Sequence, residues 1–115
     1  KNEVHYREDR SCAGYLEYER ARVRWFLSID ADLLPENAVK GEKLTYRSIK
    51  IAGEELEFSG GFTELHTESY AQILAGDGFD VDQNRTAIET VERIRVAVVN
   101  ESPINPHPLL SRVSR

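Results

Sequence analysis

Residues 22–29, with the sequence RVRWFLSI, alternate between two sets of side chains along the chain. A period of two places successive side chains on opposite faces of a β-strand, and aromatic and β-branched residues favour strands. One face carries Val23, Trp25, Leu27 and Ile29, and the other carries Arg22, Arg24, Phe26 and Ser28. The stretch therefore predicts a strand with one apolar face and one face that is largely basic and aromatic.

Other extended segments lie on both sides of this strand. Residues 14–19 (GYLEYE) precede it with a mixed alternation and are predicted to be its neighbour. Residues 45–51 and 54–58 flank Ala52-Gly53 and are predicted to form a hairpin. Gly53 supplies the positive φ that a tight hairpin turn requires. The first half of the chain is therefore rich in strands.

The hydrophobic period changes to that of a helix after Gly60 and Gly61. One stripe with helical spacing carries His66, Tyr70, Ile73 and Leu74 and ends at Gly76. Thr63 is predicted to cap the N-terminus of this helix. A second helix is predicted from about Arg85, with Ala87, Val91, Ile94 and Val98 on one face.

Three segments are predicted to be irregular. Residues 30–43 are interrupted by Pro35, Asn37 and Gly41 and are predicted to be a loop. Residues 77–82 (DGFDVD) form an acidic turn that is too short for a calcium loop and lacks its closing glutamate. Residues 100–115 carry prolines at positions 103, 106 and 108, so this tail is predicted to be extended or disordered.

The order of these elements predicts an α+β fold, with an open, mainly antiparallel sheet followed by two C-terminal helices packed on one face. Two helices cover only one face of the sheet. The opposite face, with Arg22, Arg24 and Phe26, must meet solvent, a missing domain or another subunit. We therefore predict that these three residues form an interface. The alternatives for the two arginines are pairing with Glu17 or Glu19 across the sheet and binding of a diphosphate by the guanidinium groups.

Composition excludes several functional classes. The chain has 115 residues and a net charge of −5 at pH 7, which argues against binding to a nucleic acid backbone. No stretch approaches the length of apolar sequence that spans a membrane, so no membrane partner is predicted. A single cysteine, Cys12, and the lack of a signal-peptide pattern fit a cytoplasmic, reducing compartment. The missing methionine suggests a piece of a longer protein.

Catalytic motifs are scarce. The glycines never form GxGxxG or a phosphate loop, so the sequence encodes no dinucleotide site. His5, His66 and His107 lie far apart without a metal-binding motif, and no metal site is predicted. His66 is the one candidate, because it lies in the first helical turn after a glycine-rich segment, where anions and sugars are often bound. The alternative is a histidine whose nitrogen is satisfied by a nearby carbonyl.

Several stretches resemble the C-terminal domain of bacterial nucleotide-sugar dehydrogenases. They are residues 14–30, 45–49, 53–59, 61–67, 73–76 and 88–91. The group is the Gfo/Idh/MocA oxidoreductase family, the relatives of glucose–fructose oxidoreductase and inositol dehydrogenase. Within it, the chain is most similar to members that act in lipopolysaccharide (O-antigen) biosynthesis, and the resemblance covers about residues 12–99.

The resemblance implies a parent enzyme that oxidises the carbon-3 hydroxyl of a UDP-N-acetyl sugar uronate with NAD. The family binds NAD in an N-terminal Rossmann domain, and its catalytic Glu-Lys-Pro motif and histidine are absent from this sequence, so no catalytic residue is assigned. Residues 1–99 would be part of the C-terminal substrate-binding and oligomerisation domain. The family places its strand-to-helix junction near the substrate, which implies His66 and Tyr70 as substrate-binding residues. It also implies a homodimer or homotetramer formed through the sheet face.

Two alternatives to an enzyme segment remain open. In the first, the chain is a stand-alone module that self-associates through its sheet without catalysis. In the second, it is a sugar-binding domain without catalysis, which requires a pocket in which aromatic and carboxylate groups converge.

Overall fold

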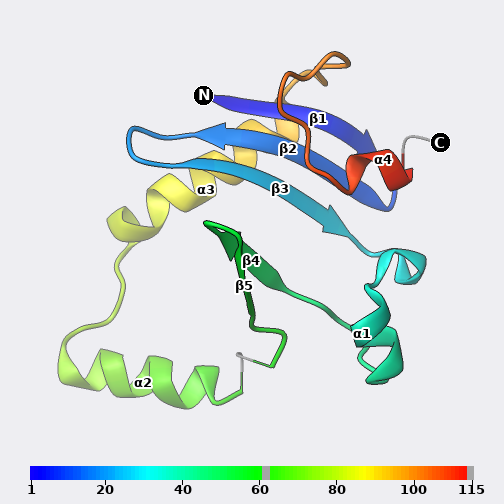
Figure 1. The fold of residues 1–115 in the computed structure, drawn as a ribbon. Coiled ribbons are helices and arrows are strands. Elements are labelled where there is room, and N and C mark those ends of the chain that lie inside the picture. Colours follow the sequence, from blue (N-terminus) through cyan, green and yellow to red (C-terminus); the bar gives the residue numbers. More distant parts are fainter. Residues whose placement is uncertain (61–62, 114–115) are drawn as a thin grey trace. The chain divides into compact units, whose positions relative to one another are not determined.

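The chain divides into two compact units, shown in the computed structural model of Figure 1, which describes residues 1–60 and 63–113. The first unit consists of Lys1–Leu33 together with the chain from Asn84 onward. The second unit consists of Leu34–Gln83. Both contain antiparallel strands and helices, so the predicted α+β class is confirmed, although the strands form two sheets instead of one.

The first unit is built on a three-stranded antiparallel sheet in the order β1-β2-β3. Its strands are β1 (Asn2–Glu8), β2 (Ser11–Glu17) and β3 (Arg22–Ser28). The register of β2 and β3 runs from Ser11 opposite Ser28 to Glu17 opposite Arg22. The predicted strand at 22–29 is thereby confirmed as β3. The neighbouring strand β2 begins at Ser11, three residues before the predicted segment 14–19, because Ser11 and the residues after it also pair with β3.

One face of this sheet packs closely around Gly14. Val4 lies opposite Gly14 across β1 and β2, and Gly14 lies opposite Trp25 across β2 and β3, so these residues share a face. A Cβ at position 14 would contact the Glu3 carbonyl oxygen and lie 2.5 Å from Cζ2 of Trp25. Only glycine therefore allows the indole ring to lie over the middle strand.

Helix α3 (Val81–Val96) covers the face that carries Gly14, and Figure 1 shows it behind the three strands. The Arg7 guanidinium on β1 donates hydrogen bonds to the carbonyl oxygens of Ile94 and Ala97, the latter at 3.0 Å. Asp80 and Gln83 bond each other reciprocally at the start of the helix, with Gln83 N donating to Asp80 Oδ1 at 2.8 Å. This capping box starts α3 at Val81 instead of the predicted Arg85.

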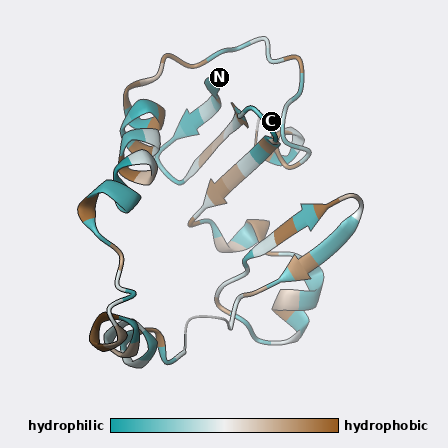
Figure 2. Cartoon of the chain, turned by 90° about the vertical axis from the view of Figure 1, so that its left-hand side faces the viewer, coloured by the Kyte–Doolittle hydropathy of each residue, from teal (hydrophilic) through white to brown (hydrophobic). Residues whose placement is uncertain are grey.

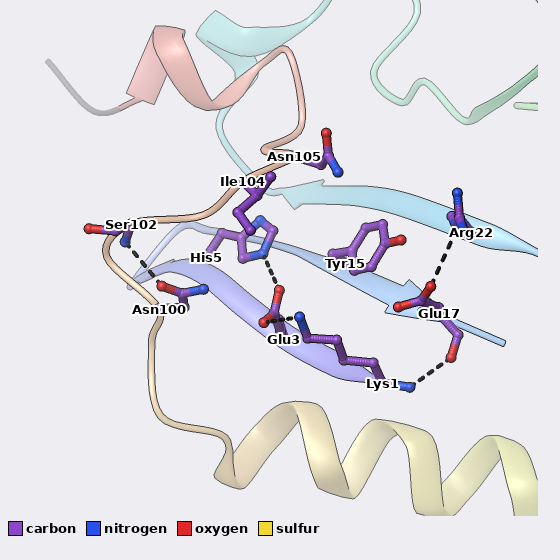
Figure 3. Close-up of a pocket in the computed structure, with 10 residues that line it drawn as sticks. All are labelled: Lys1, Glu3, His5, Tyr15, Glu17, Arg22, Asn100, Ser102, Ile104 and Asn105. Atoms are coloured by element: carbon purple, nitrogen blue, oxygen red, sulfur yellow. Dashed lines mark hydrogen bonds and ion pairs between the residues drawn. The ribbon is translucent and has the colours of Figure 1, made fainter.

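The tail after α3 returns to the sheet and crosses its other face. Val99 forms a parallel bridge with Val4, and the Asn100 amide donates to the Val4 carbonyl at 2.7 Å. Further on, Leu110–Val113 form the short helix α4. Figure 3 shows the tail and α3 on opposite sides of the strands. Neither this helix nor these contacts are predicted by the local sequence pattern.

The second unit contains the predicted hairpin. Strand β4 (Ser48–Ile51) pairs with β5 (Glu54–Glu57), and the turn between them has Ala52 at φ 50° and Gly53 at φ 88°. The predicted positive φ of Gly53 is therefore confirmed. Helix α2 (Leu65–Ala75) follows the hairpin and ends at a left-handed glycine, as predicted.

Two local predictions outside the strands are wrong. The segment 30–43 contains the 3₁₀ helix η1 (Ala31–Leu33) and helix α1 (Glu36–Lys40) as well as loop. Pro35 does not break α1 but immediately precedes it, where a missing N–H costs nothing. Glu64, with φ 62°, occupies the N-cap of α2 without a side-chain cap, so Thr63 does not have the predicted role.

Apolar side chains of the second unit stay exposed in this chain. They include Ile51, Leu56, Ile73 and Leu74, and Figure 2 shows hydrophobic positions along the hairpin and on α2. Gly61 and Phe62, which the sequence analysis places between them, lie outside the described residues. None of the helices in the described part of the chain is long and apolar enough to cross a bilayer.

The contact around Gly14 gives a stability test. We expect Gly14→Ala to lower the free energy of unfolding by about 1–3 kcal/mol, because the added methyl group overpacks the space beneath Trp25. Gly60→Ala is the matched control, since a Cβ there meets nothing within 4 Å. Urea denaturation followed by circular dichroism measures both. Equal stability of the two variants would contradict the packing described here.

Candidate binding pocket on the sheet

A polar pocket of about 310 Å³ lies in the first unit, between the sheet face opposite α3 and the tail. Figure 3 shows the side chains that line it. They are Lys1, Glu3, His5, Tyr15, Glu17, Arg22, Asn100, Ser102, Ile104 and Asn105. Strands supply the floor, and the tail supplies the opposite wall.

A β-bulge places His5 in this pocket. The register of β1 and β2 shifts between Val4, which pairs with Gly14, and Tyr6, which pairs with Ala13. The extra residue is His5, and a bulge of this kind redirects side chains next to functional sites. The His5 ring consequently lies beside Tyr15, with ring centroids 6.5 Å apart and nearly parallel planes.

Lys1, Glu3 and His5 form a chain of polar contacts across the floor. Lys1 Nζ lies 2.9 Å from Glu3 Oε1, and His5 Nε2 lies 3.2 Å from Glu3 Oε2. Hydrogen bonds from Lys1 and His5 lower the pKa of the Glu3 carboxyl, and the carboxylate raises the pKa of Lys1. Glu3 is therefore ionised near neutral pH, and its carboxylate accepts the hydrogen bond that Nε2 of His5 donates.

The His5 ring is the most confined group of the pocket. Its side chain is 0% exposed, and Nδ1 has no hydrogen-bond partner among the described residues. A buried polar atom without a partner costs free energy, so this nitrogen is a locally unfavourable feature of the sheet. Arg22 Nε and Glu17 Oε1, 3.3 Å apart, form a second ion pair at another part of the rim.

The tail wall is held in place by a stack of rings on the same sheet face. His107 lies over Phe26, with centroids 5.6 Å apart and an interplanar angle of 26°. The Leu109 amide donates to His107 Nδ1 at 3.2 Å, which requires Nδ1 to be unprotonated. Burial and the positive charge of Arg24 lower the pKa of His107, so the ring is neutral where the tail is docked. The Tyr6 hydroxyl also donates to the Val113 carbonyl at 3.5 Å.

The predicted interface residues all lie on this face, as expected from their alternation. Arg22 pairs with Glu17, which confirms the alternative role considered for it, while Arg24 lies beside His107. Phe26 is half-buried under the tail of its own chain. The face is therefore partly covered from within the chain.

The predicted substrate-binding residues lie elsewhere. His66 and Tyr70 are exposed on α2 in the second unit, one helical turn apart. They do not line the pocket described above. Sequence reasoning missed Glu3 and His5 as a pair, although their spacing of two residues on a strand was a usable signal.

Comparison with known proteins gives a clear relationship, although no family model matches the chain. The solved structure of the WlbA (WbpB) dehydrogenase from Thermus thermophilus in complex with NAD and alpha-ketoglutarate is 51% identical, with a TM-score of 0.87. The same dehydrogenase in complex with NAD and UDP-GlcNAcA is 49% identical, with a TM-score of 0.86. This chain is similar to one segment of the WlbA dehydrogenase.

The similarity to WlbA covers 95% of this chain but only 36% and 35% of the two solved chains. The resemblance to nucleotide-sugar dehydrogenases of the Gfo/Idh/MocA type is therefore confirmed. The chain spans about a third of the length of WlbA.

Docking of the tail is expected to depend on pH through His107. A lowered pKa means that the docking energy is fully present above the ordinary value of 6.5 and is lost as the pH falls through the lowered value. Protonation removes the acceptor for the Leu109 amide and adds a charge beside Arg24. The protection of the amides in residues 100–113 against hydrogen exchange, corrected for intrinsic rates, should therefore fall on acidification.

The control for this prediction is His107→Phe, which keeps a ring over Phe26 but cannot be protonated. Its tail should exchange with the same protection at acidic and neutral pH, after correction for intrinsic rates. An equal loss of protection in the variant and in the original chain would show that His107 is not the group responsible.

Proposed function

We propose that this chain is the substrate-binding and oligomerisation segment of an NAD-dependent nucleotide-sugar dehydrogenase. The observation that carries the proposal is the 51% identity to WlbA over 95% of this chain. WlbA was solved with NAD and with UDP-GlcNAcA, a UDP sugar. The proposed reaction of the parent protein is oxidation of the carbon-3 hydroxyl of a UDP-N-acetyl sugar uronate, coupled to reduction of NAD.

NAD would be held by residues outside this chain. The sequence contains no GxGxxG, and a dinucleotide site needs such a glycine turn between a strand and a helix. The described residues therefore do not fit the cofactor, and none of them is assigned a catalytic step. The residues proposed for this segment act on the substrate and on a second subunit.

The substrate-binding role is proposed for His66 and Tyr70. Both project from α2 at a spacing of four residues, so they share one helix face. Tyr70 is 67% exposed, and His66 is exposed as well. The phenol ring of Tyr70 and the imidazole of His66 are therefore accessible to a nucleotide-sugar substrate that other residues of the parent enzyme would also contact.

The oligomerisation role is proposed for the sheet face with Arg22, Arg24 and Phe26. Arg22 and Arg24 are exposed on β3, which is an edge strand of its sheet. Arginine is favoured at protein interfaces because its planar guanidinium binds carboxylates with two hydrogen bonds. A second copy of this acidic chain supplies such carboxylates.

The enzyme proposal is tested with the natural protein that contains this chain. We expect it to reduce NAD when UDP-GlcNAcA is supplied, measured as NADH absorbance. His66→Ala should raise KM about tenfold by removing a polar contact to the substrate, while the neighbouring exposed change Thr67→Ala should not. Self-association without any NAD reduction would contradict the proposal and favour a stand-alone module.

The interface proposal is tested by charge reversal. Arg24→Glu should lower the average mass measured by light scattering. The substitution replaces the guanidinium by a carboxylate, which repels the carboxylates of the second copy at the interface. Arg20→Glu, on the exposed turn between β2 and β3, is the matched control. An unchanged mass in Arg24→Glu would argue against the sheet face as the interface.

A further inference from the structure

We propose that the tail segment 101–113 controls self-association, because in its docked position it covers part of the sheet face that a second copy of this chain would use. We call this segment the strap. The proposal rests on the interface proposed above for Arg22, Arg24 and Phe26, and it adds a control over that interface. A docked strap is autoinhibitory, and a second copy binds to chains whose strap is released.

The docked strap and the proposed interface share residues of β3. The His107 ring is stacked on Phe26, with centroids 5.6 Å apart, and Phe26 is half-buried within this single chain. Arg24 lies beside the same contact, because its charge acts on His107. Arg22 lies on the same face and is exposed. A second copy therefore reaches Arg22 while the strap is docked, but it reaches Phe26 only after His107 has left.

The base of the strap is fixed to the sheet. Val99 forms a parallel bridge with Val4, and the Asn100 amide donates to the Val4 carbonyl at 2.7 Å. Both contacts precede the strap, so its release leaves the sheet edge and α3 in place. Residues 101–106 are exposed except for the partly buried Pro103, and a segment with so little burial serves as a hinge.

The far end of the strap is attached by hydrogen bonds with poor geometry. The Tyr6 hydroxyl donates to the Val113 carbonyl at 3.5 Å, which is longer than a normal hydrogen bond between oxygens. The Arg112 guanidinium donates to the Asp32 carbonyl at 3.3 Å on the exposed surface. Among the contacts between the strap and the rest of the unit, the stack of the two rings has the best geometry. Removal of the imidazole ring is therefore the change that should release the strap.

A strap of this kind makes self-association depend on the fraction of chains in which it is released. When a binding site is open in only part of the molecules, its apparent dissociation constant is the intrinsic value divided by the open fraction. Weakening the strap therefore strengthens association without any new contact between the two copies.

The test measures the dissociation constant for self-association of the full chain by sedimentation equilibrium at neutral pH. His107→Ala should lower this constant by about two- to tenfold, the factor that one aromatic stack contributes to the docked state. Ile104→Ala is the matched control, because Ile104 belongs to the same tail and is 90% exposed. Hydrogen exchange of the amides in residues 109–113 should show loss of protection in His107→Ala and no loss in Ile104→Ala.

Arg24→Glu separates this proposal from the interface proposal on which it rests. In the His107→Ala background, where the ring no longer covers the face, Arg24→Glu should raise the dissociation constant by about tenfold or more. If it does so, but His107→Ala with a released strap associates no more tightly than the original chain, the interface stands and the strap proposal is overturned. If Arg24→Glu changes nothing in this background, the sheet face is not the interface and both proposals are overturned.

Discussion

The hydrogen bond from the Asn100 amide to the Val4 carbonyl, 2.7 Å long, determines how the first unit is arranged. It ties the chain that leaves α3 to the outer edge of β1, next to the bridge between Val99 and Val4. From this point the tail continues over the face opposite the helix. The pocket, the cover over Phe26 and the position of α4 all follow from that crossing.

The two faces of the sheet have different tasks because their side chains differ. The face with Val4, Gly14 and Trp25 is closely packed around Gly14 and lies under α3. The other face carries charged pairs and a buried histidine with an unpartnered nitrogen.

The sequence predicted the strand at 22–29, the hairpin around Gly53 and the α2 helix because each has a strong local period or an obligatory turn residue. It did not predict the pocket, because the bulge at His5 and the docking of the tail depend on contacts between residues far apart in sequence. The prolines in the tail predicted an extended or disordered segment, but a local pattern contains no information about which sheet face such a segment will cover. The family resemblance came from long matching strings, and the similarity to WlbA confirms it.

The most direct test of this account is a nuclear Overhauser measurement between the rings of Phe26 and His107 at neutral pH. The two ring centroids lie 5.6 Å apart, so the account predicts clear cross-peaks between their protons. Their presence would show that the tail lies on the sheet face and forms a wall of the pocket. Their absence, with the sheet intact, would contradict the docked tail and the binding pocket that depends on it.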